Sequence, residues 1–230
     1  MYIFCMDINR RELLIGGVGL VGGGFVGGYG ISKLGNGESD SVEEEVSFGL
    51  SKSPVIGSDD APVKLLYWVD FQCPFCYRFS QNQFNLIYDE FISSGEVQLV
   101  LKPLTIFGED SFRSAVSMHC VNSVSDGSAV LEWYKELHEL YNESSGRNTG
   151  WAEYNVLVDE AGAFDSVSVS ELSSCIEDSE YNSQIRDEYE TGKGLGLRGT
   201  PFFALFNSSD PSDYETISGV QQYSYFKSKI

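Results

Sequence analysis

Between residues 63 and 101 the spacing of apolar residues is first strand-like, then helical, then strand-like again. Val63 to Val69 is a mainly apolar run, which predicts a buried strand. Cys73 to about Ser93 carries apolar residues near helical spacing, which predicts a helix that Gly95 ends. Val97 to Leu101 predicts a second strand. Strand, helix and strand in this order form a right-handed βαβ unit, which places the start of the helix at the carboxyl edge of the sheet.

Beyond this unit the spacing of apolar residues is helical over a long stretch, from about residue 110 to 194, and then returns to strands. The order predicts an α/β protein in which an all-helical insertion separates a βαβ half from a ββα half. The predicted helices are Ser111 to Val124, about Val130 to Tyr141, Trp151 to Ala161, Val169 to Ile176 and Tyr181 to Tyr189. They are followed by strands at Phe202 to Phe206 and Tyr214 to Ile217 and a last helix at Tyr223 to Ile230.

The N-terminal residues 1–34 form a separate module. The pair Arg10-Arg11 precedes an uncharged run, Leu13 to Ile31, which is the layout of an export signal or a membrane anchor. The arginine pair resembles the twin-arginine signal. We favour an uncleaved anchor, with export and a disordered glycine-rich leader as alternatives. Residues 35–52 are acidic and rich in Gly and Ser, which predicts a flexible linker before a folded domain at 53–230.

Charge excludes one class of partner. The chain carries 34 acidic and 15 basic residues, a formal net charge of −19. Nucleic acid and anionic lipid surfaces would repel such a protein. Because the Debye length at about 1 M salt is only about 3 Å, self-repulsion of this size is screened in concentrated salt. The charge therefore favours a salt-loving source, with an ordinary acidic protein as the alternative.

Two cysteines separated by two residues, Cys73 and Cys76, carry the strongest chemical signal. At a helix start the Cys73 sulfur would face unpaired N–H groups and the positive end of the helix dipole, which favours its thiolate. Cys76 would lie one turn further on and be shielded, and Pro74 suits the first helical turn. A zinc half-site is the alternative. Zinc would need two further ligands at similar spacing, and the other cysteines stand alone, namely Cys5, Cys120 and Cys175.

Four segments, in order along residues 53–230, resemble the DsbA-like branch of the thioredoxin superfamily. They are Gly57-Ser58-Asp59-Asp60-Ala61-Pro62, Asp70-Phe71-Gln72-Cys73-Pro74-Phe75-Cys76, Gly199-Thr200-Pro201-Phe202-Phe203 and Ile217-Ser218-Gly219. The resemblance implies a thioredoxin fold with a helical insertion, and thiol-disulfide exchange with protein cysteines outside the cytoplasm.

The resemblance also implies residue roles. Cys73 would be the nucleophilic cysteine and Cys76 its resolving partner. Pro201 would be a cis-proline beside the pair, and the Thr200 backbone would pair with an extended substrate segment. Substrate contacts from Pro74 and Phe75, between the two cysteines, would complete the site.

The chain departs from the family at two positions. Phe75 stands where the best-known members have a histidine that helps hold the thiolate, and Tyr67 stands where thioredoxins bury an acid. Asp70 is then the carboxylate nearest in sequence that could move a proton to or from Cys76, and a helix cap is its alternative role.

Cys120 and Cys175 both fall in the predicted helical insertion. Outside the cytoplasm they could pair into a structural disulfide worth about 4 kcal/mol in the chain-entropy model. Two buried free thiols are the equal alternative.

These observations predict an exported, membrane-tethered thiol-disulfide oxidoreductase that acts on cysteine-containing proteins and is reoxidised by a membrane redox partner. The reaction requires no cofactor and no metal. Action as a reductase or isomerase is the alternative, which Thr200 before Pro201 leaves open. A metal-binding or chaperone-like module, with the cysteine pair as a soft site for copper or zinc, is the alternative from another class.

Overall fold

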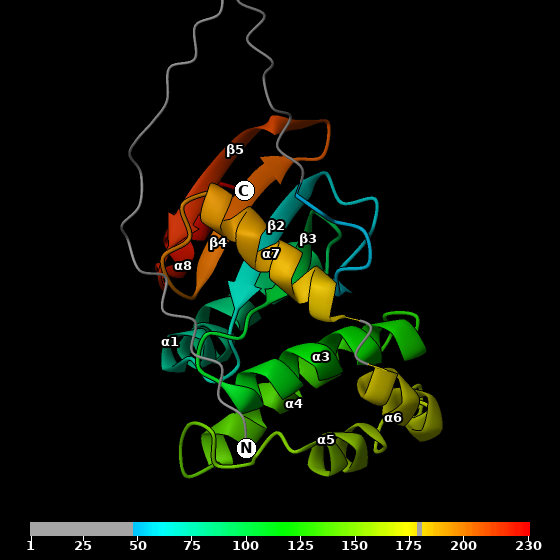
Figure 1. Cartoon of the computed structure of the whole chain (residues 1–230). Helices are drawn as coiled ribbons and strands as arrows, with labels where there is room; N and C mark the ends of the chain where they lie inside the picture. Colours follow the sequence, from blue (N-terminus) through cyan, green and yellow to red (C-terminus); the bar gives the residue numbers. More distant parts are fainter. Residues whose placement is uncertain (1–47, 179–180) are drawn as a thin grey trace, which may run out of the picture. The chain divides into compact units, whose positions relative to one another are not determined.

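The computed structural model describes residues 48–178 and 181–230, so the predicted anchor and most of the predicted linker lie outside it. Its centre is a five-stranded sheet in the order β1-β3-β2-β4-β5 (Figure 1). Strands β2 and β3 are parallel, and the other neighbours are antiparallel. The strands are β1 (Val55–Ile56), β2 (Val63–Val69), β3 (Val97–Pro103), β4 (Phe202–Asn207) and β5 (Asp210–Ser218).

One helix joins β2 to β3, five follow β3, and one ends the chain (Figure 1). The first is a continuous helix in which α-helical and π-helical hydrogen bonding alternate: α1 (Pro74–Phe79), η1 (Ser80–Phe84), α2 (Asn85–Ile87) and η2 (Tyr88–Ile92). The others are α3 (Glu109–Val124), α4 (Val130–Glu143), α5 (Tyr154–Ala161), α6 (Val169–Asp178), α7 (Asn182–Gly194) and α8 (Tyr223–Lys227). The predicted α/β architecture with a helical insertion between its two halves is confirmed.

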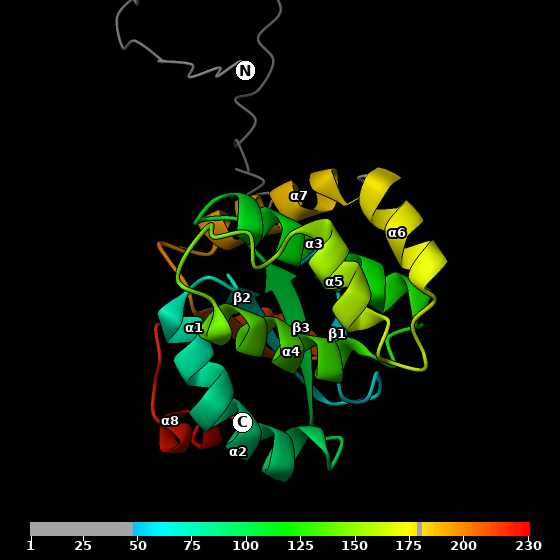
Figure 2. The same cartoon turned by 90° about the horizontal axis from the view of Figure 1, so that it is seen from below.

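Helices cover both faces of the sheet, with α7 on one side and α1 and α8 on the other (Figure 2). The alternation of side chains along β2 explains this arrangement. Leu66 and Trp68 point to the side of α7, where the Trp68 indole donates a hydrogen bond of 2.8 Å to the Glu188 main-chain oxygen. Tyr67 points to the other side and packs on Phe79 of α1 and Phe203 of β4. Because both faces are covered, β2 is apolar along almost its whole length.

Strand β1 is absent from the sequence-based prediction. It has only two residues, Val55 and Ile56, paired with Val100 and Leu99 of β3. A strand this short has no periodicity to detect. The sequence-based prediction also begins the last strand at Tyr214, whereas β5 begins at residue 210, in a stretch whose turn-forming residues hide the strand.

The chain packs on the sheet earlier than residue 53, the predicted start of the domain. Phe48 is buried, and its ring stacks on Phe206 at 4.4 Å between centroids and meets Tyr214 edge to face. The serines and glycines around Phe48 make this segment look like a linker in the sequence. The buried Phe48 ring anchors this segment to the sheet through its contacts with Phe206 and Tyr214.

Candidate active site

Cys73 lies at the N-cap of α1, directly after the turn that follows β2. Its main-chain oxygen accepts the first helical hydrogen bond from Tyr77 N, at 3.0 Å, and Pro74 takes the first helical position. Proline is suited to this position because its missing N–H would have no helical partner there. The sulfur of Cys73 therefore stands where the unpaired N–H groups of a helix start are concentrated.

The two sulfurs of the pair differ sharply in environment. Neither cysteine is in a disulfide, and both are almost fully buried, at 2% and 0% exposure, so the difference lies in how each sulfur is hydrogen-bonded and desolvated. A hydrogen bond from Cys76 lowers the pKa of Cys73 to about 6, with help from Thr200 and the N–H groups of Phe75 and Cys76, against the opposing effect of burial. Burial raises the pKa of Cys76 well above its ordinary value. Near neutral pH one sulfur is therefore a thiolate and the other a thiol.

The loop before β4 faces the cysteine pair. The Thr200–Pro201 peptide bond is cis, and the Cys73 sulfur lies 3.3 Å from the Thr200 main-chain oxygen. The chain order separates these residues by more than a hundred positions, and the antiparallel pairing of β2 with β4 brings them together. The predicted residues Cys73, Cys76, Thr200 and Pro201 thus form one cluster.

A cleft of about 430 Å³ opens beside this cluster. Phe75, the residue that replaces the family's histidine, is 51% exposed and forms one wall. Its ring is covered by the Arg78 guanidinium at 4.9 Å from the centroid. The remaining lining residues come from the cis-proline loop and the end of β5, namely Arg198, Gly199, Thr200, Pro201, Ser218, Gly219 and Val220.

Asp70 is buried behind the pair, and its carboxylate is fully engaged. It accepts hydrogen bonds from Gln72 N at 2.9 Å, the Ser111 hydroxyl at 2.7 Å, Ile106 N at 2.7 Å and Phe107 N at 3.2 Å. Burial raises its pKa, against the effect of these bonds. The carboxylate therefore anchors the loop after β3 and the start of α3 to the cysteine turn. Its role in proton transfer stays a prediction.

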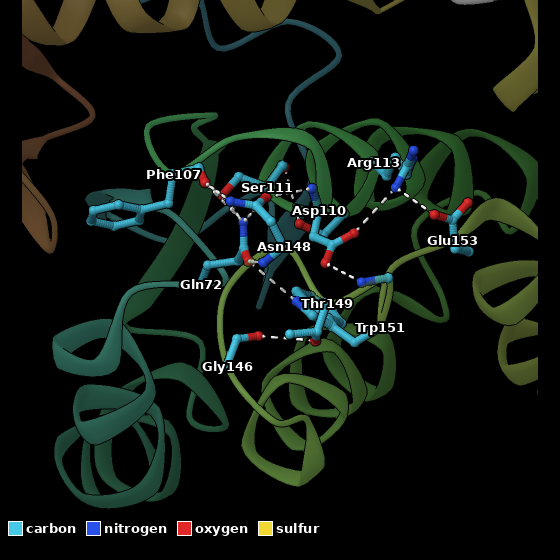
Figure 3. Close-up of polar contacts among 12 residues, drawn as sticks. Gln72, Phe107, Asp110, Ser111, Arg113, Gly146, Asn148, Thr149, Trp151 and Glu153 are labelled. Atoms are coloured by element: carbon cyan, nitrogen blue, oxygen red, sulfur yellow. Dashed lines mark hydrogen bonds and ion pairs between the residues drawn. The ribbon is translucent and has the colours of Figure 1, made fainter.

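Gln72, the residue before Cys73, ties the active site to the helical insertion (Figure 3). Its amide nitrogen donates to the Ser111 hydroxyl at 2.8 Å, and its amide oxygen accepts from Asn148 N at 2.7 Å. Asn148 in turn donates to the Phe107 main-chain oxygen. The two ends of the Gln72 amide are thus held by α3 and by the loop after α4, and these two segments fix the position of the cysteine turn.

Buried polar groups without partners in the described part of the chain lie on the α1 side of the sheet, with Tyr67 and Tyr134 close to Cys76 and His138 packed against Tyr134. Both ring nitrogens of His138 and the hydroxyls of Tyr67 and Tyr134 form no well-oriented hydrogen bond within the described residues. Burial lowers the pKa of His138 to about 3, so this histidine is neutral. Burial also raises the pKa of the Tyr67 and Tyr134 hydroxyls, so both are protonated.

Cys120 and Cys175 lie apart from the site and form a disulfide between α3 and α6, with their Cα atoms 5.8 Å apart. It closes the helical insertion on itself. Among the described residues no group of three or more His, Cys, Asp or Glu side chains is arranged to hold a metal ion.

Residues that the sequence-based prediction missed complete the site. Gln72 stands inside the cysteine motif, but nothing in the sequence assigns its side chain a partner. Arg147 donates from Nε to the Gln72 main-chain oxygen at 3.1 Å and stacks on the Phe107 ring at 3.6 Å. Arg78 and Arg198 line the cleft. The sequence signal that points to Arg78 and Arg198 is their closeness to Cys76 and Pro201 along the chain. Arg147 has no such signal, because it lies far from both motifs in sequence.

An ionised sulfur at a helix start, with a protonated and buried one behind it, defines the class of this protein as a thiol-disulfide oxidoreductase. Comparison with known proteins agrees with this class. A family model described as Thioredoxin matches residues 50–219. The chain therefore belongs to the thioredoxin family, and within that superfamily it is DsbA-like.

Relatives and solved structures support this placement. The chain is 24% identical over 163 residues to disulfide bond formation protein D of Bacillus subtilis (strain 168), with 71% of each chain covered. The structure of oxidised BdbD from Bacillus subtilis matches with a TM-score of 0.66 and 20% identity over 78% of this chain and 91% of that chain. Wolbachia pipientis alpha-DsbA1 matches with a TM-score of 0.61 and 19% identity over 78% of this chain and 89% of that one. The predicted membership of the DsbA-like branch is confirmed.

Proposed function

We propose that this chain oxidises cysteine-containing proteins outside the cytoplasm through the Cys73–Cys76 pair, and that residues 1–34 tether it to a membrane. A substrate thiolate attacks the Cys73 sulfur of the enzyme disulfide, and Cys76 leaves and takes up a proton. A second substrate thiolate attacks the substrate sulfur of the mixed disulfide and releases the Cys73 thiolate. The substrate loses two electrons and gains a disulfide, while the enzyme becomes a dithiol that a membrane redox partner reoxidises.

The observation that carries the proposal is the difference between the two sulfurs. Cys73, with a pKa of about 6, is a good leaving group at neutral pH, whereas Cys76 is buried and holds its proton. A stabilised Cys73 thiolate stabilises the reduced enzyme and so makes its disulfide a stronger oxidant. The name of the relative in Bacillus subtilis, disulfide bond formation protein D, agrees with this direction.

Support for the location comes from the second cysteine pair. The Cys120–Cys175 disulfide belongs to the type that persists in oxidising compartments. None of the helices in the described part of the chain has the length and apolar character to cross a bilayer. The proposed tether is the uncharged run in residues 1–34, which lies outside the described residues.

The reduction potential of the pair tests the direction. We expect the purified protein, equilibrated with mixtures of reduced and oxidised glutathione, to have a potential above about −180 mV, which is more oxidising than that of protein disulfide isomerase. A lower value would contradict the oxidising direction and assign the pair to reduction or isomerisation.

Two serine variants test the role of each cysteine. Cys73→Ser should abolish exchange, because it removes the attacked sulfur. Cys76→Ser should accumulate a mixed disulfide between Cys73 and a disulfide-bearing substrate, because nothing resolves it. Intact mass before and after reduction measures both. Exchange retained by Cys73→Ser, or a mixed disulfide formed through Cys76, would overturn the assignment.

A further inference from the structure

We propose that the cleft beside Cys73 selects substrate segments that carry carboxylate side chains next to their cysteine. This inference rests on the proposed function and names the chemistry of the substrate. The occupant is an extended, acidic segment of a cysteine-containing protein, laid along the Thr200–Pro201 loop with its sulfur at Cys73.

Two exposed arginines line the cleft, Arg78 from α1 and Arg198 from the loop before Thr200. Neither forms an ion pair with a described carboxylate, whereas Arg113 elsewhere pairs with both Asp110 and Glu153. Arg78 is fixed over the Phe75 ring. The cleft thus offers two guanidinium groups whose charge no acid of the described chain neutralises.

A third arginine, outside the cleft, lies beside the residue that precedes Cys73. Arg147 is held by its bond to the Gln72 oxygen and by the Phe107 ring, and its remaining N–H groups have no partner among the described residues. Because Gln72 directly precedes Cys73, this guanidinium is close to the reactive turn. A segment bound across Cys73 would therefore meet a third positive charge near the cysteine turn.

This concentration of positive charge runs against the composition of the chain, whose net charge is −19. Three other clefts on the described surface each have two carboxylates among their lining residues: Asp187 and Glu188, Asp59 and Asp126, and Asp213 and Glu215. Lys52 and Lys102 balance the first pair and Lys229 balances half of the last, so none of the three has an excess of positive charge. The cleft beside Cys73 has no carboxylate among its described lining residues. Charge complementarity therefore points to an acidic occupant at this cleft and at none of the other three.

The chemistry of the lining also favours carboxylates over other acceptors. A guanidinium presents parallel N–H groups that match the two oxygens of a carboxylate. Phe75, Pro201 and Val220 supply apolar surface next to the arginines. An acidic segment with an apolar residue near its cysteine would satisfy both parts of the cleft.

Peptide kinetics test the proposal. Short peptides with one cysteine, flanked on both sides by Glu, Gln or Lys, would be compared by kcat/KM for reaction with the oxidised full-length protein. Exposed charge pairs contribute about 2-fold to 5-fold each, so we expect about a 10-fold preference for Glu over Gln. The preference should fall to about 2-fold at about 1 M salt, where the Debye length is about 3 Å. The Lys peptide should be the slowest.

Variants assign the preference to the cleft. Arg78→Gln combined with Arg198→Gln should bring the Glu-to-Gln ratio close to one. Arg186→Gln is the matched control, because Arg186 is exposed on α7 and lines none of these clefts, and it should keep the wild-type ratio. Thermal unfolding would verify that all variants are folded.

The outcomes separate this proposal from the function on which it rests. Rapid reaction of all three peptides at equal rates, a preference for Lys, or a ratio unchanged in the double variant overturns the acidic preference and leaves the oxidoreductase intact. No reaction with any peptide overturns both.

Discussion

Two buried polar regions on opposite faces of the sheet differ in whether their polar groups are hydrogen-bonded. Under α7, Lys102, Glu188 and His119 form a closed network: Lys102 donates to Gly49 O at 2.6 Å and the Ser53 hydroxyl at 2.8 Å. Glu188 contacts Lys102 at 3.8 Å and His119 at 3.2 Å, with side chains at most 3% exposed. Beside α1, the Tyr67 and Tyr134 hydroxyls and the ring nitrogens of His138 form no well-oriented hydrogen bond with a described residue.

The two regions have different roles in the protein. Burial lowers the pKa of Lys102, and Glu188 opposes that effect, so the network compensates the desolvation of its own charges. Around Cys76 the compensation is incomplete: the effect of burial, which disfavours the thiolate, is larger than that of the Asp70 main chain and Tyr67, which lower the pKa of the thiol. A satisfied network stabilises the fold. Beside α1, burial keeps the Cys76 thiol protonated while Cys73 is ionised. Thiol-disulfide exchange requires this difference.

The largest loss of unfolding free energy should follow from a substitution in the network of Lys102, Glu188 and His119. Glu188→Ala leaves Lys102 and His119 without their shared carboxylate, and removal of one partner of a buried pair costs about 3 kcal/mol. Urea unfolding measures the loss. Glu190→Ala is the control on the same helix, because Glu190 forms only an exposed pair with Lys193 and should cost less than about 1 kcal/mol. Equal losses in the two variants would contradict the distinction between the regions.

A smaller effect concerns the ionisation of Cys73. The ultraviolet absorbance of the reduced protein should show a thiolate titrating with a midpoint of about 6. Cys76→Ala should raise this midpoint, because it removes the hydrogen bond that lowers the pKa most. Cys73→Ser should abolish the transition, and a midpoint near the ordinary cysteine value of about 8.5 in the wild type would contradict the assigned asymmetry.

The same shift has a consequence for stability. The pKa of Cys73 is lower in the folded protein than in the unfolded chain, so its contribution is fully present above about pH 8.5 and is lost as the pH falls through about 6. The unfolding free energy of the reduced protein relative to Cys73→Ser should therefore rise between these two values.

The sequence predicts one of these regions far better than the other. The spacing of Cys73 and Cys76 at a helix start marks the reactive pair, and the family resemblance places Thr200-Pro201 beside it. The structure has both at strand ends that the pairing of β2 with β4 brings side by side. The Lys102–Glu188 network could not be predicted. Its members lie on β3 and α7, and their pairing depends on the packing of α7 across the sheet.

The same limit applies within the site. Gln72 and Asp70 stand inside the motif, so the sequence marks both. Their partners Ser111 and Asn148 come from α3 and from the loop after α4, and no local pattern points to them. Phe75 is the opposite case, since its exposure follows from its position between the two cysteines.

The smallest effect should come from the unsatisfied region, through His138. His138→Leu removes two ring nitrogens that have no partner among the described residues, so we expect the unfolding free energy at neutral pH to rise by about 1 kcal/mol. The pKa of His138 is lowered to about 3, so the stability that its neutral form supplies is full above the unfolded value of about 6.5 and declines as the pH falls towards 3. His138→Leu should flatten this decline by up to about 1.4 kcal/mol per pH unit.

The matched variant is His119→Leu on the other face. His119 is equally buried, but it bonds to Glu188 and lies 3.4 Å from the Gln184 amide nitrogen, so its loss should destabilise the protein. Urea unfolding between about pH 4 and pH 7 compares the two variants. Opposite signs at neutral pH are expected because one histidine completes a network and the other completes none. Destabilisation by both variants would show that His138 has a polar partner, and would contradict the difference between the region beside α1 and the region under α7.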